Sequence, residues 1–228
     1  FSTTAKTTDL NASDLYVFGC TLSRALNAGF GMIVNTKDKY IVATAPRAAT
    51  MTVHNSLAKL SGARWVVGVN ADSWADHHTT RIPHEWKTYR RVIVVRNPYT
   101  RLLSLSDHYN RKRVSEGLKP WHFHEFIGEY KRLGWFYSFT QKQWAAGLEP
   151  AAIIRVETLR EDIKSVLGKS LKISPAKTDR KAWREHYRNI KYQVLVDLYH
   201  ELLPDLTLGY INEAITPNQA SIYGGIDF

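Results

Sequence analysis

Two arginines and three hydroxyl residues stand where predicted strands give way to predicted helices, a combination typical of phosphate binding. Arg96 follows the apolar run 92–95, and Ser104 lies eight residues further along the chain. Eight residues make about two helical turns, so an arginine at the strand end and a hydroxyl on the helix could contact one phosphate. The residues alone leave a second interpretation open, a capped helix with solvated arginines.

The second candidate phosphate site is the segment 46–52, which reads Pro-Arg-Ala-Ala-Thr-Met-Thr between a predicted strand and a predicted helix. Its backbone N–H groups could surround a phosphate while Arg47 and the hydroxyls of Thr50 and Thr52 complete the contacts. The Gly-Lys-Ser/Thr signature of a Walker A loop is absent, and so is a paired acidic strand for Mg²⁺, which argues against an ATPase or kinase. The alternative is an ordinary helix N-terminus with threonine caps.

The elements that must position these residues follow from the spacing of apolar side chains. Short β-branched runs alternate with helical patterns, which predicts an α/β fold in which helices flank a mainly parallel central sheet. Asn97 can cap the helix after the 92–95 strand through its side-chain oxygen, and Pro98 suits the first helical position. The strands are predicted at 31–34, 40–45, 65–69, 92–95 and 151–156, the first two forming a hairpin. The helices are predicted at about 53–62, 99–113 and 121–133, with one that ends at Leu167 and one at 191–203.

Length and composition limit the class of protein. A chain of 228 residues with 44% hydrophobic residues can bury a full core, and residues 14–228 are predicted to form one domain behind a flexible polar arm at 1–13. Cys20 is the single cysteine, which excludes an internal disulfide and favours a reducing compartment, the cytoplasm. A lost targeting segment stays open as an alternative. No apolar run is long enough for a stable membrane span. The net charge of +10 favours an anionic partner.

Histidines supply the candidate general bases. His77 and His78 lie in a predicted loop, with His84 close behind, and a neutral imidazole can take a hydroxyl proton near neutral pH. Adjacent extended residues point to opposite sides, and no cysteine or carboxylate cluster adjoins these two, so no metal site is predicted. Further along, Lys177, Arg180 and Trp183 belong to a basic segment that could hold a nucleotide base or single-stranded nucleic acid, the alternative being a solvated helix face.

Together these segments resemble the sulfotransferases that use 3′-phosphoadenosine-5′-phosphosulfate (PAPS). Residues 96–104 match that family's Arg-[Asp/Asn]-Pro-x-x-Arg-[apolar]-x-Ser block, and 155–162 resemble its Arg-x-Glu-x-Leu-x-x-Asp segment. Residues 198–210 are similar to its closing helix and Phe-Gly-Tyr turn. Its donor loop usually reads Pro-Lys-x-Gly-[Ser/Thr]-[Ser/Thr], whereas Arg47 and Ala49 replace the lysine and the glycine here. Alanine tolerates a positive φ poorly.

The resemblance implies a P-loop-like sulfotransferase fold and transfer of a sulfuryl group from PAPS to a hydroxyl or an amine, with release of 3′,5′-ADP and without a metal. It implies that Arg96 and Ser104 bind the 3′-phosphate. It implies that the residues of the donor loop make the remaining contacts with the cofactor. Within that loop, Arg47 is expected to stabilise the leaving group. The donor-loop residues are Arg47, Ala48, Ala49, Thr50, Met51 and Thr52.

The resemblance identifies the general base, the adenosine contacts and the acceptor less specifically. His78 is the first choice for the base, before His77 and His84, and Lys177, Arg180 and Trp183 are candidates for the adenosine end. The acceptor is expected to be a small molecule or a glycan. Two other classes stay open, a basic nucleic-acid-binding protein and a nucleotide kinase-like P-loop protein, although no nucleic-acid partner is expected.

Overall fold

The structure is a computed structural model that describes residues 32–66, 82, 84–133, 140–146, 148–173, 183–188 and 190–219. The chain divides into two compact units, residues 1–30 and 31–228, and every described residue belongs to the second. The predicted boundary between residues 13 and 14 lies outside the described residues. No helix in the described ranges is both long and apolar enough to cross a membrane.

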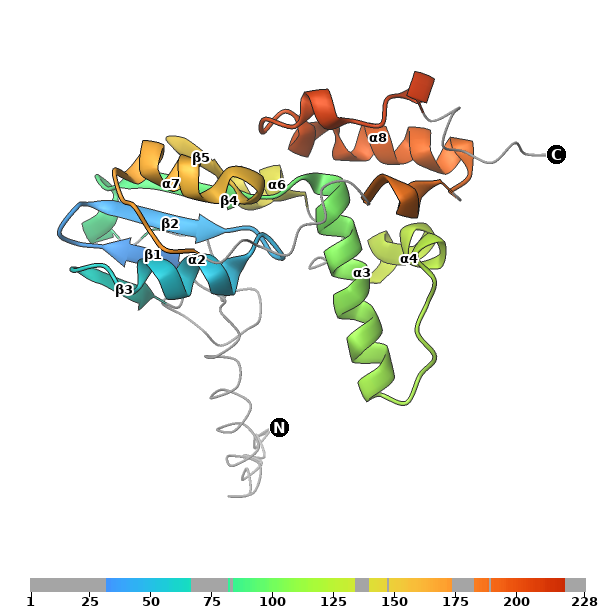
Figure 1. The fold of residues 1–228 in the computed structure, drawn as a ribbon, viewed down its shortest axis with the longest axis horizontal. Helices are drawn as coiled ribbons and strands as arrows, with labels where there is room; N and C mark the ends of the chain where they lie inside the picture. The colour runs from blue at the N-terminus through green and yellow to red at the C-terminus, as the bar shows by residue number, and fades with distance from the viewer. Residues whose placement is uncertain are drawn as a thin grey trace, which may run out of the picture. The chain divides into compact units, whose positions relative to one another are not determined.

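One five-stranded sheet forms the centre of this unit, with the order β3-β1-β2-β4-β5 (Figure 1). Its strands are β1 (Met32–Asn35), β2 (Tyr40–Thr44), β3 (Ala63–Val66), β4 (Arg90–Val95) and β5 (Ala152–Arg155). Strands β2, β4 and β5 are parallel neighbours, whereas β1 runs antiparallel to both β2 and β3. The α/β class is therefore confirmed.

The prediction of a mainly parallel sheet was wrong, because the sheet is mixed. The four-residue turn 36–39 joins β1 to β2, and a connection this short reverses the chain and produces an antiparallel pair. The buried Asn35 stabilises the turn, since its Oδ1 accepts hydrogen bonds from the N–H groups of Lys37 at 3.0 Å and Asp38 at 2.8 Å. The predicted hairpin was correct, and it excludes an all-parallel arrangement.

Helices cover both faces of the sheet, and the alternation of side chains along β4 shows why. Val92 and Val94 face a core shared with α2 (Thr50–Leu57) and α7 (Leu159–Leu167). Ile93 and Val95 face a larger core on the opposite side. That core takes in α3 (Pro98–Ser115), α4 (Phe123–Glu129), α6 (Gln141–Ala146) and α8 (Tyr192–Leu206). Burial on both faces explains the unbroken apolar run of β4.

The helix predictions agree with these elements to within a few residues at most ends. The helix predicted at 121–133 is α4 followed by a 3₁₀ turn, Tyr130–Leu133. Further 3₁₀ turns lie at His84–Trp86, Val156–Thr158, Trp183–Tyr187 and Ile211–Glu213.

Candidate functional site

The two predicted phosphate segments lie side by side at one edge of the sheet. Strands β2 and β4 are parallel neighbours in register, with Thr44 opposite Val94, so their carboxyl ends meet. The N–H of Ala45 donates to the carbonyl of Val94 at 3.1 Å and continues this pairing into the loop. The loop before α2 and the turn before α3 therefore begin next to each other. The carboxyl edge of parallel strands is the usual place for ligands in α/β sheets.

The loop 46–49 has an unusual backbone. Arg47 has a φ of 67° and Ala49 a φ of 55°, both in the left-handed region that side-chain-bearing residues rarely adopt. Ala49 is the N-cap of α2 and has no side chain that could cap the first turn, so a threonine-capped helix is not what forms here. Left-handed residues at a helix start turn neighbouring N–H groups toward a common side, which is a geometry that binds anions.

Arg47, Ser104 and Arg96 come together across this edge, from three separate segments. The Nε of Arg47 donates to the Oγ of Ser104 at 3.1 Å, across 57 residues of sequence. The Nη1 of Arg96 donates to the carbonyl of Arg47 at 3.4 Å. The sequence predicts that Arg96 and Ser104 share one anion, and the structure places Arg47 in contact with both.

The side chain of Gln141, a fully buried residue on α6, binds both the backbone N–H and the backbone carbonyl of Arg96. The N–H of Arg96 donates to Oε1 of Gln141 at 2.7 Å, and Nε2 of Gln141 donates to the carbonyl of Arg96 at 2.7 Å. The Arg96 side chain is partly buried, and its Nε donates to Oγ1 of Thr100 at 3.0 Å. Burial lowers the pKa of Arg96, and the charge of Glu157 opposes this change in part. An anion beside this guanidinium would compensate for its lost hydration.

Asn97 and Pro98 start α3 as predicted. The Oδ1 of Asn97 accepts hydrogen bonds from the N–H groups of Tyr99 at 3.0 Å and Thr100 at 3.2 Å, and Pro98 occupies the first helical position. The amide of Asn97 is also used, because its Nδ2 donates to Oε2 of Glu213 at 2.6 Å. The cap therefore fixes the direction of α3 and connects it to the 3₁₀ turn Ile211–Glu213.

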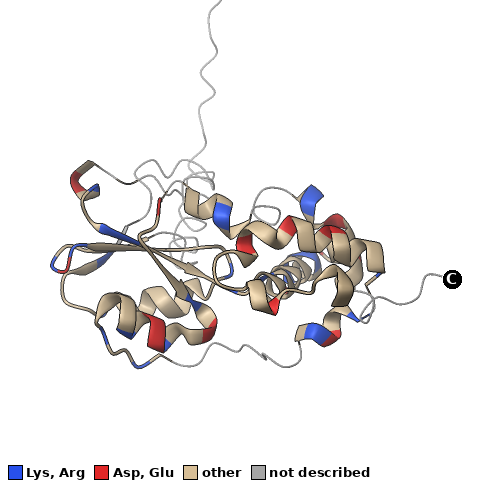
Figure 2. Cartoon of the chain, turned by 90° about the horizontal axis from the view of Figure 1, so that it is seen from above, with Lys and Arg blue, Asp and Glu red and all other residues tan. Residues whose placement is uncertain are grey.

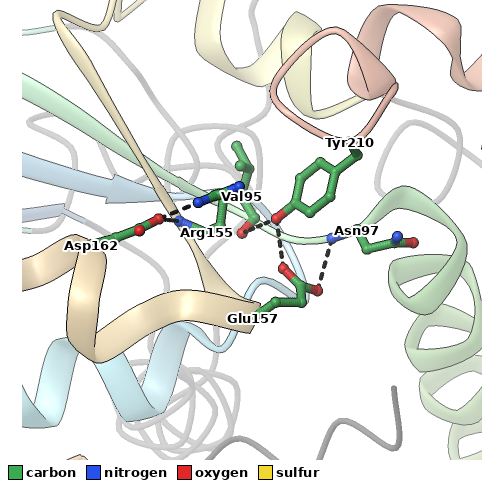
Figure 3. Close-up of polar contacts among 6 residues, drawn as sticks. All are labelled: Val95, Asn97, Arg155, Glu157, Asp162 and Tyr210. Atoms are coloured by element: carbon green, nitrogen blue, oxygen red, sulfur yellow. Dashed lines mark hydrogen bonds and ion pairs between the residues drawn. The ribbon is translucent and has the colours of Figure 1, made fainter. Parts of the chain in front are cut away.

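The other segments that resemble the family form a scaffold behind the site (Figure 3). Glu157 accepts the N–H of Asn97 on Oε1 at 3.0 Å and the hydroxyl of Tyr210 on Oε2 at 2.6 Å. The Tyr210 hydroxyl also lies 3.3 Å from the carbonyl of Val95, and its burial and the charge of Glu157 raise its pKa. The N–H of Arg155 donates to Asp162 at 2.8 Å. These residues hold the end of β4 in place.

Arg101 connects α3 to the loop 46–49. Its side chain is 2% exposed, and its Nε donates to the carbonyl of Pro46 at 3.0 Å. The Nη2 atom is buried and has no hydrogen-bond partner among the described residues. Burial lowers the pKa of this group, and the charge of Asp205 opposes that change. Arg101 therefore fixes the position of the residue that precedes Arg47.

The remaining predicted site residues lie in several different environments. His77, His78, Lys177 and Arg180 lie outside the described residues. Ala48 is fully buried, whereas Met51 is exposed, and Thr50 accepts a hydrogen bond from the hydroxyl of Thr44 at 3.0 Å. His84 is exposed on its 3₁₀ turn. No group of side chains that could hold a metal ion is present in the part of the chain that the structure describes.

Trp183 has a place that argues against the predicted contact with adenosine. Its side chain is 5% exposed, and its ring stacks on Tyr99 with the ring centroids 5.0 Å apart. The guanidinium of Arg184 lies 4.8 Å from the same ring. Trp183 therefore packs in the core beside α3, and its ring is not presented to a ligand.

Two contributors to the site had no signal in the sequence. Gln141 contacts Arg96 across 45 residues, and Asp205 of α8 accepts the N–H of Lys142 at 2.9 Å, next to Gln141. Gln141 lies in no recognised motif, and Asp205 lies in the segment 198–210 but not at a position that the resemblance names. Only the packing of α6 and α8 on the same face of the sheet brings them to β4.

Comparisons of the chain with protein-family models, with curated proteins and with solved structures find no match.

Proposed function

We propose that this protein is a PAPS-dependent sulfotransferase with the P-loop-like fold of that family. The observation that carries the proposal is the meeting of Arg47, Ser104 and Arg96 at the carboxyl ends of β2 and β4. These are the residues to which the resemblance assigns the two phosphate ends of the donor. Two guanidinium groups at one edge of the sheet suit an anionic ligand, because hydrogen bonds to ionised groups are the strong ones.

In this proposal the two segments have different tasks. Arg96 and Ser104 bind the 3′-phosphate and distinguish PAPS from nucleotides that lack it. Arg47 and the N–H groups at the start of α2 face the 5′-phosphosulfate. During transfer, negative charge grows on the phosphate oxygen that leaves the sulfur, and preorganised donors stabilise that charge. The acceptor is a hydroxyl or an amine on a small molecule or a glycan.

Calorimetry without metal tests the proposal against the two other classes. We expect 3′,5′-ADP to bind at least about tenfold more tightly than 5′-AMP or ATP, because only it carries the 3′-phosphate. A nucleotide kinase would prefer ATP and require Mg²⁺. Equal or absent binding of 3′,5′-ADP would contradict the proposal.

A salt series separates the site from nonspecific binding of nucleic acid. A nucleic-acid-binding protein would bind an oligonucleotide with an affinity that falls steeply with salt. Figure 2 shows basic positions interspersed with acidic ones over the described elements. We expect 3′,5′-ADP to displace any bound oligonucleotide only at the donor site. If the affinities for 3′,5′-ADP and for the oligonucleotide fall equally as salt is added, the assignment of this site to the nucleotide is contradicted.

The acceptor and the compartment belong to the same proposal. Incubation with radiolabelled PAPS and panels of phenols, sugars and amines identifies the acceptor class by the labelled product. A single cysteine, Cys20, fits a reducing compartment, because such a chain has no internal disulfide to maintain.

A further inference from the structure

The end of α3 that lies away from the sheet carries two exposed apolar side chains. Val114 is 59% exposed and Leu118 is 48% exposed, and every residue from 114 to 120 is exposed. Among the described residues, no other two exposed large apolar side chains lie this close in sequence. A single exposed apolar side chain is ordinary on a protein surface, whereas apolar side chains that gather in one place are typical of a docking surface.

Backbone hydrogen bonds hold the turn that presents these two residues. The N–H of Leu118 donates to the carbonyl of Arg113 at 2.8 Å, and the N–H of Gly117 donates to the carbonyl of Val114 at 3.1 Å. With Gly117 at a φ of 76°, this is a Schellman motif. An apolar residue at the position of Leu118 usually packs on an apolar residue in the last helical turn. Here the corresponding helix residues are Lys112 and Arg113, and Leu118 remains half exposed.

Side-chain contacts fasten the segment after the turn to α3. The guanidinium of Arg113 lies 4.6 Å from the ring of Trp121, and its Nε donates to the carbonyl of Lys119 at 2.8 Å. The side chain of Asn110 binds both the N–H and the carbonyl of Trp121, each at 2.8 Å. A turn that is already held in one shape loses little conformational freedom when it docks.

Cationic side chains accompany the apolar ones. Four cations and one carboxylate give the segment 111–120 a net charge of +3, and they are Arg111, Lys112, Arg113, Lys119 and Glu116. Asp107 and Glu125 flank the segment, and Oε2 of Glu125 accepts the N–H of His122 at 2.6 Å. Cations together with exposed apolar side chains are complementary to a membrane surface, which has anionic headgroups over an apolar interior.

We propose that residues 111–120, the α3 tip, dock on the surface of an anionic lipid membrane. The cations approach the headgroups, while Val114 and Leu118 enter the boundary between headgroups and acyl chains. Cations alone suit any polyanion, a nucleic acid included. The exposed apolar side chains favour a membrane, because a nucleic-acid backbone offers no apolar interior in which to bury them. This inference goes beyond the proposed function and does not depend on it.

The position of the α3 tip keeps the candidate site at a distance from the lipid. Figure 1 shows α3 running from the sheet to the connection with α4. Its eighteen residues, Pro98–Ser115, span about 25 Å along the helix axis. A protein docked through the α3 tip therefore has the carboxyl edge of its sheet at the other end of this helix, where the donor can reach it from solution.

Co-sedimentation of the full chain with lipid vesicles tests the proposal. Vesicles of phosphatidylcholine with about 30% phosphatidylserine are compared with vesicles of phosphatidylcholine alone. We expect binding to the anionic vesicles to be at least about tenfold tighter, and to weaken as salt is added. Equal binding to the two kinds of vesicle, or no binding to either, would overturn the proposal.

A matched pair of variants tests the apolar contribution. Leu118→Ser and Ile211→Ser each remove an apolar side chain that is 48% exposed, so neither is expected to unfold the protein, which circular dichroism checks. Leu118→Ser should weaken binding to anionic vesicles by about fivefold, whereas Ile211→Ser should change it by less than about twofold. Binding by Leu118→Ser that is as tight as binding by Ile211→Ser would overturn insertion of the α3 tip into a membrane.

A second pair tests the cations. Arg111→Gln combined with Lys119→Gln should weaken binding to anionic vesicles by about tenfold or more. Lys59→Gln combined with Arg132→Gln removes two exposed charges elsewhere and should change binding by less than about twofold. If the Arg111 and Lys119 variant loses binding and Leu118→Ser does not, the α3 tip is a site for polyanions and the membrane proposal is overturned.

Nucleotide binding keeps this test separate from the proposed function. The affinity of Leu118→Ser for 3′,5′-ADP should stay within about twofold of the wild type, because Leu118 lies far from the candidate site. Vesicle binding by a wild-type protein that does not bind 3′,5′-ADP would support the α3 tip and contradict the proposed function. The reverse result would overturn the α3 tip alone.

Discussion

At the scale of single residues, the segments that resemble the sulfotransferases divide into two groups. Arg47, Arg96 and Ser104 face the edge of the sheet where a ligand would bind. Glu157 and Tyr210 bind each other and the end of β4. A shared sequence pattern therefore does not by itself distinguish residues that touch a ligand from residues that hold the site.

Replacing Tyr210 tests the second group. Tyr210→Phe removes the hydroxyl that donates to Glu157 at 2.6 Å and leaves a partly buried carboxylate with one donor fewer. We expect the free energy of unfolding, measured in urea, to fall by about 1–2 kcal/mol. Tyr192→Phe is the matched control, because Tyr192 is an exposed large side chain, and it should change stability by less than about 0.5 kcal/mol. Equal effects of the two substitutions would contradict the scaffold role of Tyr210.

His54 gives the protein a pH dependence. Its ring is 0% exposed, and burial lowers its pKa from 6.5 to about 4. Because the folded state favours the neutral ring, its contribution to stability is complete above about pH 6.5 and is lost as the pH falls toward 4. The loss amounts to up to about 3 kcal/mol at pH 4. His54→Leu should remove that part of the acid destabilisation in urea unfolding at pH 7 and pH 4.5. An unchanged pH dependence would show that His54 does not titrate on unfolding.

At the scale of the elements, the start of α2 determines the shape of the loop 46–49. Ala49 caps this helix with a φ of 55°, where the resembling family usually has glycine. An alanine in this conformation costs about 1 kcal/mol, whereas glycine adopts it freely. The loop thus keeps a left-handed conformation that its own residue disfavours. Such strain is common where a backbone is shaped for a ligand.

Glycine substitutions at the two ends of α2 should act in opposite directions. Ala49→Gly relieves the left-handed conformation, and we expect it to raise the free energy of unfolding by about 0.5 kcal/mol while 3′,5′-ADP still binds. Ala58 caps the other end of α2 with a φ of −61°, where alanine has no strain to relieve. Ala58→Gly should therefore lower stability, by up to about 1 kcal/mol. A loss of stability in Ala49→Gly as large as that in Ala58→Gly would contradict the strained loop.

The sequence was most informative about elements whose signals are local. The β1–β2 hairpin, the apolar run of β4 and the Asn97-Pro98 start of α3 all depend on neighbouring residues, and all three form as predicted. The direction of β3 depends instead on where the chain returns after α2. Its antiparallel pairing with β1 adds to the mixed character of the sheet and carries no local signal. The two hydrogen bonds between Gln141 and the backbone of Arg96 also depend on tertiary packing and have no local sequence signal.

At the scale of the whole molecule, the parallel pairing of β2 and β4 makes the site. It brings together the ends of two segments that are separated by about fifty residues, and Arg47 then reaches Ser104. The antiparallel half of the sheet, β3 and β1, lies on the far side of β2 from this meeting point. The mixed sheet therefore leaves the arrangement that the proposal needs intact. Gln141 of α6 and Tyr210 contact the residues at the end of β4, and Asp205 of α8 holds the start of α6 beside them.

The affinity ratio of 3′,5′-ADP to 5′-AMP, measured by calorimetry in the wild type and in Arg96→Ala, tests the central claim most directly. Arg132→Ala removes the same charge from a side chain that is 80% exposed and serves as the control. We expect Arg96→Ala to weaken 3′,5′-ADP by about 10- to 100-fold, to change 5′-AMP by less than about threefold, and so to bring the ratio close to one. Arg132→Ala should keep the wild-type ratio. A folded Arg96→Ala variant that keeps the wild-type ratio would contradict the claim that Arg96 reads the 3′-phosphate.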